Sequence, residues 1–146
     1  MKIAITGTTR GLGKHLYNVF KLDNDIITFN REDNFEEFVK KVEDTDLLIN
    51  NSYLDGRQVE LFDRTIDKIK RTIVIGSIAA DNPDPRLAEY SKQKKLLKDK
   101  VDIYNKKILY LQLTGLGYQH PESIVECINL WLNNPSIKSI NFYAYE

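Results

Sequence analysis

Three side chains in the second half of the chain have the types and spacing needed to move a proton. Ser77 follows the apolar run 72–75, and Tyr90 and Lys94 lie further along, one helical turn apart. A phenol titrates at about pH 10, but a neighbouring ammonium favours the phenolate and lowers that pKa. A serine hydroxyl can donate to a carbonyl oxygen on which negative charge develops. The spacing Tyr-x-x-x-Lys is common, and it gains its value here from its distance after a serine at a strand end. We therefore predict catalytic roles for Ser77, Tyr90 and Lys94.

A glycine-rich turn near the start has the composition of a phosphate-binding loop. The apolar run 3–5 is followed by Thr-Gly-Thr-Thr-Arg-Gly-Leu-Gly at 6–13, and then by apolar residues at helical spacing. Glycine allows positive φ and close approach of a ligand, and the N–H groups at a helix start attract phosphate. The predicted cofactor-binding residues here are Gly7, Thr9, Arg10, Gly11, Leu12 and Gly13. The alternative is a tight turn without a ligand.

Asn30 and Arg31 follow the next apolar run and bear on the choice of cofactor. An acidic residue at this place would hold the ribose 2′-hydroxyl of NAD, whereas an arginine pairs with a 2′-phosphate. Arg10 is a second cation that could reach the same phosphate. The sequence therefore favours NADP(H) over NAD(H), and a solvated surface role for Arg31 is the alternative.

Small polar residues follow the run 46–49 as well. Asn50, Asn51 and Ser52 could fix the ribose and backbone of a cofactor, so we predict that they bind it. Ordinary turn chemistry is the alternative interpretation of these three residues.

The pattern of apolar runs predicts the elements that position these side chains. We expect strands at 2–6, 25–29, 46–50, 72–76, 107–113 and 139–145, and helices at 11–21, 34–43, 57–70, 86–99 and 121–133. Strict alternation implies right-handed crossovers and a parallel sheet covered by helices on both faces. The predicted fold class is α/β, a single Rossmann-like doubly wound sheet of about six strands, with ligands bound beyond the carboxyl ends of the strands. The length fits one domain, 1–146.

Composition excludes several other classes of protein. Lys+Arg and Asp+Glu are both 21, so net charge gives no attraction to nucleic acid or to a membrane surface. Cys127 is the only cysteine, which excludes an intrachain disulfide, and we predict no metal site. The chain enters a strand directly and has no apolar run long enough to span a membrane, so a cytoplasmic location is expected.

In their order along the whole chain, these motifs resemble those of the short-chain dehydrogenase/reductase family. The family's Thr-Gly-x-x-x-Gly-x-Gly matches 6–13, and its Asn-Asn-Ala-Gly is matched in part by 50–53. Ser77 corresponds to the family's catalytic serine, and 90–94 to its Tyr-x-x-x-Lys. Its Pro-Gly after the following strand is similar to Thr114-Gly115, so Gly115 joins the cofactor-binding candidates.

The resemblance implies an NADP(H)-dependent oxidoreductase that reduces a carbonyl or oxidises an alcohol of a small molecule. Tyr90 would donate the proton as hydride arrives from a nicotinamide. Lys94 would lower the pKa of Tyr90 and hold the ribose, and Ser77 would orient the carbonyl. Members of the family often dimerise, so the resemblance leaves open whether this chain forms a homo-oligomer.

The chain also departs from the family pattern. Residues 31–46 have room for one helix rather than for a helix, a strand and a second helix. No asparagine lies in 53–72, where the family carries a fourth catalytic residue. The family builds its substrate lid between Gly115 and Pro121, and only a short segment is left there. The missing asparagine and the missing lid favour the alternative function, a catalytically reduced dinucleotide-binding sensor or scaffold.

Overall fold

Strands and helices alternate along the chain, as the sequence predicts. A computed structural model describes residues 1–104, 107–114 and 120–142. The strands are β1 (Lys2–Thr6), β2 (Asp25–Phe29), β3 (Leu47–Asn50), β4 (Thr72–Ser77), β5 (Ile108–Leu113) and β6 (Ser139–Asn141). The helices are α1 (Gly11–Phe20), α2 (Phe35–Val42), α3 (Arg57–Thr65), α4 (Ala88–Ile103) and α5 (Pro121–Asn133). Short 3₁₀ turns lie at η1 (Leu54–Gly56), η2 (Ile78–Ala80) and η3 (Pro85–Leu87).

The strands form one six-stranded sheet in the order β2-β1-β3-β4-β5-β6. Strand β1 pairs in parallel with β2 and with β3, and β5 pairs in parallel with β6. The order reverses between β1 and β3, the kind of point where doubly wound sheets bind ligands. The Rossmann-like fold class is thus confirmed, and the single helix α2 connects β2 to β3, as the short segment 31–46 predicts. The chain divides into two compact units, Met1–Ile73 and Val74–Glu146, and the expectation of a single domain stays a prediction.

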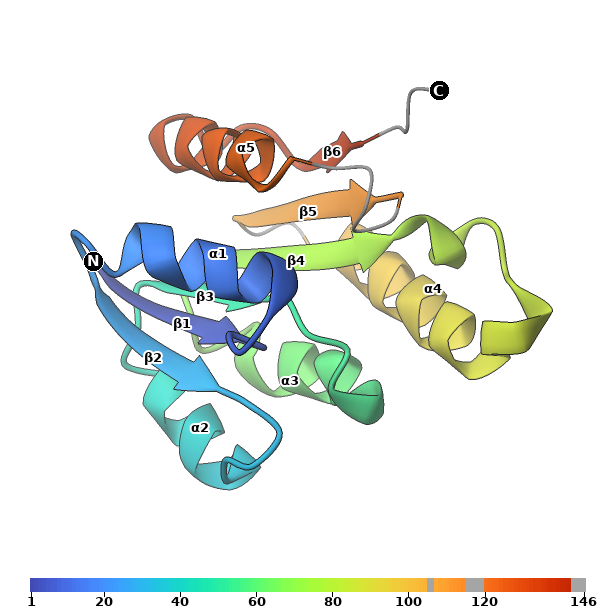
Figure 1. Cartoon of the computed structure of the whole chain (residues 1–146), viewed down its shortest axis with the longest axis horizontal. Helices are drawn as coiled ribbons and strands as arrows, with labels where there is room; N and C mark the ends of the chain where they lie inside the picture. Colours follow the sequence, from blue (N-terminus) through green and yellow to red (C-terminus); the bar gives the residue numbers. More distant parts are fainter. Residues whose placement is uncertain (105–106, 115–119, 143–146) are drawn as a thin grey trace. The chain divides into compact units, whose positions relative to one another are not determined.

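In the first unit, α1 lies on one face of the strands and α2 and α3 lie on the other (Figure 1). The second face is sealed by a cluster of buried apolar residues: Ala4, Phe29, Phe35, Phe38, Val39, Val42, Leu48, Leu61 and Ile69. Helix α2 begins where predicted, because the Asn34 side chain accepts the Glu37 N–H at 3.0 Å. The helix predicted at 57–70 ends early, at Thr65. Ile66 and Ile69 remain buried in the turn that follows, and this burial extends the helical pattern of the sequence.

In the second unit, α4 and α5 lie on opposite sides of β4 and β5 (Figure 1). Every residue of β5 is buried, as expected for a strand covered on both faces. The inner face of α4 buries Ser91 and Lys94 beside Leu97 and Val101, and the helix runs to Ile103 rather than to residue 99. The part of the predicted last strand beyond residue 142 lies outside the described residues.

Candidate active site

The glycine turn in the first unit needs glycine at each of its three positions, for two different reasons. Gly7 and Gly11 have φ of 71° and 57°, in the left-handed region. A Cβ at Gly13 would lie 1.9 Å from the Gly7 carbonyl oxygen, and one at Gly7 would lie 2.7 Å from Ser52 Cβ. No atom lies near a Cβ placed at Gly11. The turn therefore packs closely against itself and against the segment after β3.

Thr6 joins the glycine turn to the segment after β3. Its buried Oγ1 accepts the backbone N–H groups of Asn51 and Ser52, each at 3.0 Å, and Asn51 Nδ2 donates to the Thr6 carbonyl at 3.1 Å. The carboxyl ends of β1 and β3 thus form one fixed edge. We did not predict this role for Thr6, although a threonine that ends a strand before a glycine was a visible signal.

The start of α1 is open to an anion. Arg10 is the N-cap residue, is exposed and makes no side-chain capping bond, and the first turn carries no acidic residue. Uncapped N–H groups at a helix start attract phosphate, and the adjacent guanidinium adds positive charge. Of the other predicted residues of this turn, Thr9 is exposed, whereas Leu12 is buried on the inner face of α1.

At the end of β2, the Asn30 side chain is turned toward Thr8. Asn30 Oδ1 accepts the Thr8 N–H at 2.8 Å, and its Nδ2 donates to Thr8 Oγ1 at 3.0 Å. Arg31 has a side chain that is 81% exposed, and its Nη2 lies 3.8 Å from Asp55 Oδ2. Asn30 thus holds the loop, while Arg31 faces solvent beside a carboxylate.

Asn50 has a packing role in this structure. It is fully buried, its Nδ2 donates to the Gln58 carbonyl at 3.0 Å, and Gln58 Nε2 donates back to the Asn50 carbonyl at 3.0 Å. The pair anchors α3 to β3. The Asn50 Oδ1 atom has no hydrogen-bond partner among the described residues. Asn51 and Ser52 are the half-buried members of this predicted set.

In the second unit, α4 brings Lys94 against Tyr90 and against β4. Lys94 is 4% exposed, its Nζ lies 5.5 Å from the centroid of the Tyr90 ring, and it donates to the Ile75 carbonyl at 3.1 Å. Burial lowers the pKa of Lys94 to about 8. Ser77 ends β4, and its Oγ accepts the Ala79 N–H at 3.1 Å, which leaves the hydroxyl proton free to donate elsewhere.

A second tyrosine, which we did not predict, lies beside the Ser77 end of β4. Tyr110 from β5 crosses Gly76, and its hydroxyl donates to Gln112 Oε1 at 3.3 Å. Burial raises the pKa of this phenol, and the Asp81 carboxylate raises it further. The signal in the sequence was two polar residues, Tyr110 and Gln112, on the same face of an apolar strand.

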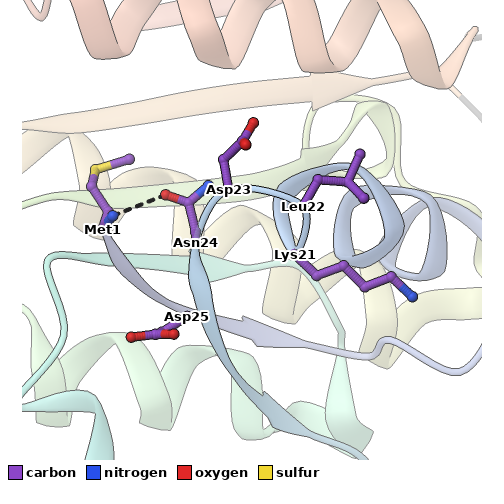
Figure 2. Close-up of a pocket in the computed structure, with 6 residues that line it drawn as sticks. All are labelled: Met1, Lys21, Leu22, Asp23, Asn24 and Asp25. Carbon is purple, nitrogen blue, oxygen red and sulfur yellow. Dashed lines mark hydrogen bonds between the residues drawn. The ribbon is translucent and has the colours of Figure 1, made fainter.

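An open pocket of about 400 Å³ lies at the amino end of β1, lined by Met1, Lys21, Leu22, Asp23, Asn24 and Asp25 (Figure 2). The α-amino group of Met1 donates to Asn24 Oδ1 at 3.0 Å across it. This is the end of β1 opposite to the glycine turn. The pocket therefore has no part in the predicted phosphate site.

The described ranges 1–104, 107–114 and 120–142 contain no group of three or more His, Cys, Asp or Glu that could hold a metal ion. None of their helices is both long enough and apolar enough to cross a membrane. The predicted cofactor residue Gly115 lies outside these ranges.

Comparison with known proteins gives the fold a name. No family model matches the sequence, and no curated protein matches it. The structure is similar to a nucleoside-diphosphate-sugar epimerase from Staphylococcus aureus, with TM-score 0.72, 15% identity and coverage of 100% of this chain and 73% of that chain. It is also similar to a short-chain dehydrogenase/reductase (wide type) from Veillonella parvula in complex with NADP, with TM-score 0.62, 12% identity and coverage of 96% and 93%. A third similar structure is the 3-alpha-hydroxysteroid dehydrogenase from Pseudomonas complexed with NADH, with TM-score 0.59, 17% identity and coverage of 97% and 95%. The chain therefore has a fold of the short-chain dehydrogenase/reductase type.

Proposed function

We propose that this chain is an NADP(H)-dependent oxidoreductase that reduces a carbonyl or oxidises an alcohol of a small molecule. The observation that carries the proposal is the buried Lys94 ammonium against the Tyr90 ring. Burial lowers the pKa of Lys94, and strongly perturbed groups of this kind gather at functional sites. The same proposal includes a cytoplasmic location and no nucleic-acid or membrane partner. It leaves open whether the chain forms a homo-oligomer.

The residues of the first unit fit a dinucleotide. Because Gly7 and Gly13 carry no side chain, the turn packs closely and a ligand can approach its backbone. The uncapped start of α1 offers N–H groups to a diphosphate. Asn51 and Ser52, held by Thr6, would line the ribose. Preference for NADP(H) rests on Arg10 and Arg31, and the similar structures are complexed with NADP in one case and NADH in another.

The residues of the second unit fit the proton-transfer part of the reaction. A bound nicotinamide supplies or accepts the hydride. Tyr90 would hold the transferred proton at its phenol oxygen, and the Lys94 ammonium would favour the phenolate form. The Ser77 hydroxyl, which keeps a proton free to donate, would orient the carbonyl and stabilise charge on its oxygen.

The test is carbonyl-dependent oxidation of NADPH, followed as loss of the reduced nicotinamide absorbance. Benzaldehyde, cyclohexanone and 9,10-phenanthrenequinone serve as probe carbonyls. We expect turnover of at least one probe by the wild type and a loss of about 100-fold or more in Ser77→Ala. Binding of NADPH without oxidation in the presence of any probe would contradict the enzymatic proposal.

That outcome would favour the second candidate, a dinucleotide-binding sensor or scaffold. One observation supports it: α3, Arg57–Thr65, contains no asparagine, so a relay through such a side chain is missing from this helix. The two candidates share the cofactor site and differ only in turnover.

A further inference from the structure

The strand end that carries Ser77 is covered by a side chain from the neighbouring strand. A Cβ at Gly76 would lie 2.1 Å from the Tyr110 phenol oxygen and 2.2 Å from its Cζ. Gly76 does not have positive φ, so glycine is required at this position for space alone. The Tyr110 phenol, with only 3% of the residue exposed, therefore lies directly over the backbone before Ser77.

A directed chain of hydrogen bonds fixes this phenol from its other side. Lys98 Nζ donates to both Asp81 oxygens at 2.8 Å, and Gln112 Nε2 donates to Asp81 Oδ2 at 3.0 Å. Because a carboxylate only accepts, it sets the orientation of the Gln112 amide, and Oε1 must face Tyr110. The Tyr110 hydroxyl donates to that oxygen at 3.3 Å, so its proton is already committed.

Because the phenol proton is donated to Gln112, the lone pairs of the phenol oxygen can accept a hydrogen bond from the backbone of β4. Burial raises the pKa of Tyr110, and the Asp81 carboxylate raises it further, whereas the adjacent backbone of Ser77 lowers it. The phenol therefore stays neutral in the working pH range. It can accept from Ser77, but it is a poor proton donor for a reaction.

We propose that Tyr110 is a positioning residue for Ser77, whose phenol oxygen, oriented by Gln112 and Asp81, accepts the Ser77 N–H and fixes the end of β4. In the reaction, Tyr110 acts only through Ser77 and touches no reacting atom. This second part rests on the proposed oxidoreductase function. The fixing of the strand end does not, so the two can be tested separately.

The first test is amide hydrogen exchange of Ser77 by NMR in the wild type and in Tyr110→Phe. The phenylalanine ring still fits over Gly76, but the acceptor oxygen is lost. We expect exchange at Ser77 to become about tenfold faster, the equivalent of one ordinary hydrogen bond, while the amides of Ile3 and Ile5 in β1 do not change. Unchanged exchange at Ser77 would overturn the proposal. Gln112→Met, which removes only the orienting partner, should give a smaller increase.

The second test uses NADPH and the three probe carbonyls. Tyr110→Phe should lower kcat about tenfold and leave KM for NADPH unchanged. In a Ser77→Ala background the same substitution should have no further effect, because its action passes through Ser77. Additive losses would overturn the positioning role. If the wild type reduces no probe, the proposed function fails, and the exchange rate of Ser77 alone decides whether Tyr110 fixes the strand end.

Discussion

Two tyrosine–lysine pairs in the described part of the chain have the same spacing and the same contact. On α1, Lys21 Nζ lies 4.9 Å from the centroid of the Tyr17 ring, and on α4, Lys94 Nζ lies 5.5 Å from that of Tyr90. Lys21 is exposed at the end of its helix, whereas Lys94 is buried against β4. Helical spacing alone produces the contact in both places. The difference lies in solvation, because only a desolvated ammonium acts strongly on its neighbour.

The largest expected difference between the two pairs is in turnover. Tyr90→Phe removes the proposed proton donor and should lower reduction of the probe carbonyls by about 100- to 10,000-fold. Tyr17→Phe makes the same chemical change on the exposed pair and should leave turnover as it is. NADPH binding should survive in both variants. Equal rates in Tyr90→Phe and Tyr17→Phe would remove Tyr90 from the mechanism.

The second difference is in stability and in its dependence on pH. The pKa of Lys94 falls from 10.5 to about 8 through burial, which corresponds to roughly 3 kcal/mol of cost for the charged form. Between pH 8 and 10.5 the unfolded chain binds this proton and the folded chain does not, so the cost is full below pH 8 and fades as pH rises.

Lys94→Met removes this charge and should therefore raise the free energy of unfolding at pH 7. The gain should be about 1 to 3 kcal/mol, since the hydrogen bond to Ile75 is also lost. The advantage over the wild type should shrink above pH 8 and disappear above about pH 10.5. Chemical denaturation at several pH values measures it, with Lys21→Met as the exposed control. A Lys94→Met variant less stable than the wild type at pH 7 would mean that the ammonium stabilises the fold.

The glycine turn offers a third contrast, between two of its own residues. Gly13→Ala places a Cβ 1.9 Å from a carbonyl oxygen and must shift the loop, whereas Gly11→Ala meets open space and only the strain of φ 57°. We expect Gly13→Ala to weaken NADPH binding at least tenfold and Gly11→Ala to weaken it less. Calorimetric titration measures both. Equal affinities in the two variants would show that the loop packing does not serve the cofactor.

The smallest expected effect concerns the choice of cofactor. Asp55 lies beside Arg31 on left-handed backbone, with φ 53°, and its carboxylate would oppose a 2′-phosphate held by that arginine. Asp55→Asn should strengthen NADPH binding about two- to threefold at low salt and leave NADH binding unchanged, because the pair is exposed. A gain that is equal for both cofactors would exclude contact of Arg31 with the 2′-phosphate.

The sequence predicted the fold well because apolar periodicity marks buried strands and helix faces directly. It failed at the end of α3, where Ile66 and Ile69 are buried in a turn and continue the helical pattern. The ability of Gly7 and Gly13 to pack the turn was predictable. The side-chain orientations of Asn30 and Asn50 could not be predicted. Their hydrogen bonds with Thr8 and Gln58 form only when the chain is folded. Tyr110 was missed for the same reason, since its contact with Gly76 depends on the order of the strands.

Titration of the wild type with NADPH and NADH, by calorimetry, tests the central claim most directly. The claim is that the glycine turn holds a nicotinamide dinucleotide. We predict saturable binding of one dinucleotide per chain, with NADPH preferred over NADH and the NADPH affinity at least tenfold weaker in Gly13→Ala. No binding of either dinucleotide at millimolar concentration would contradict the claim, and both proposed functions would fail with it.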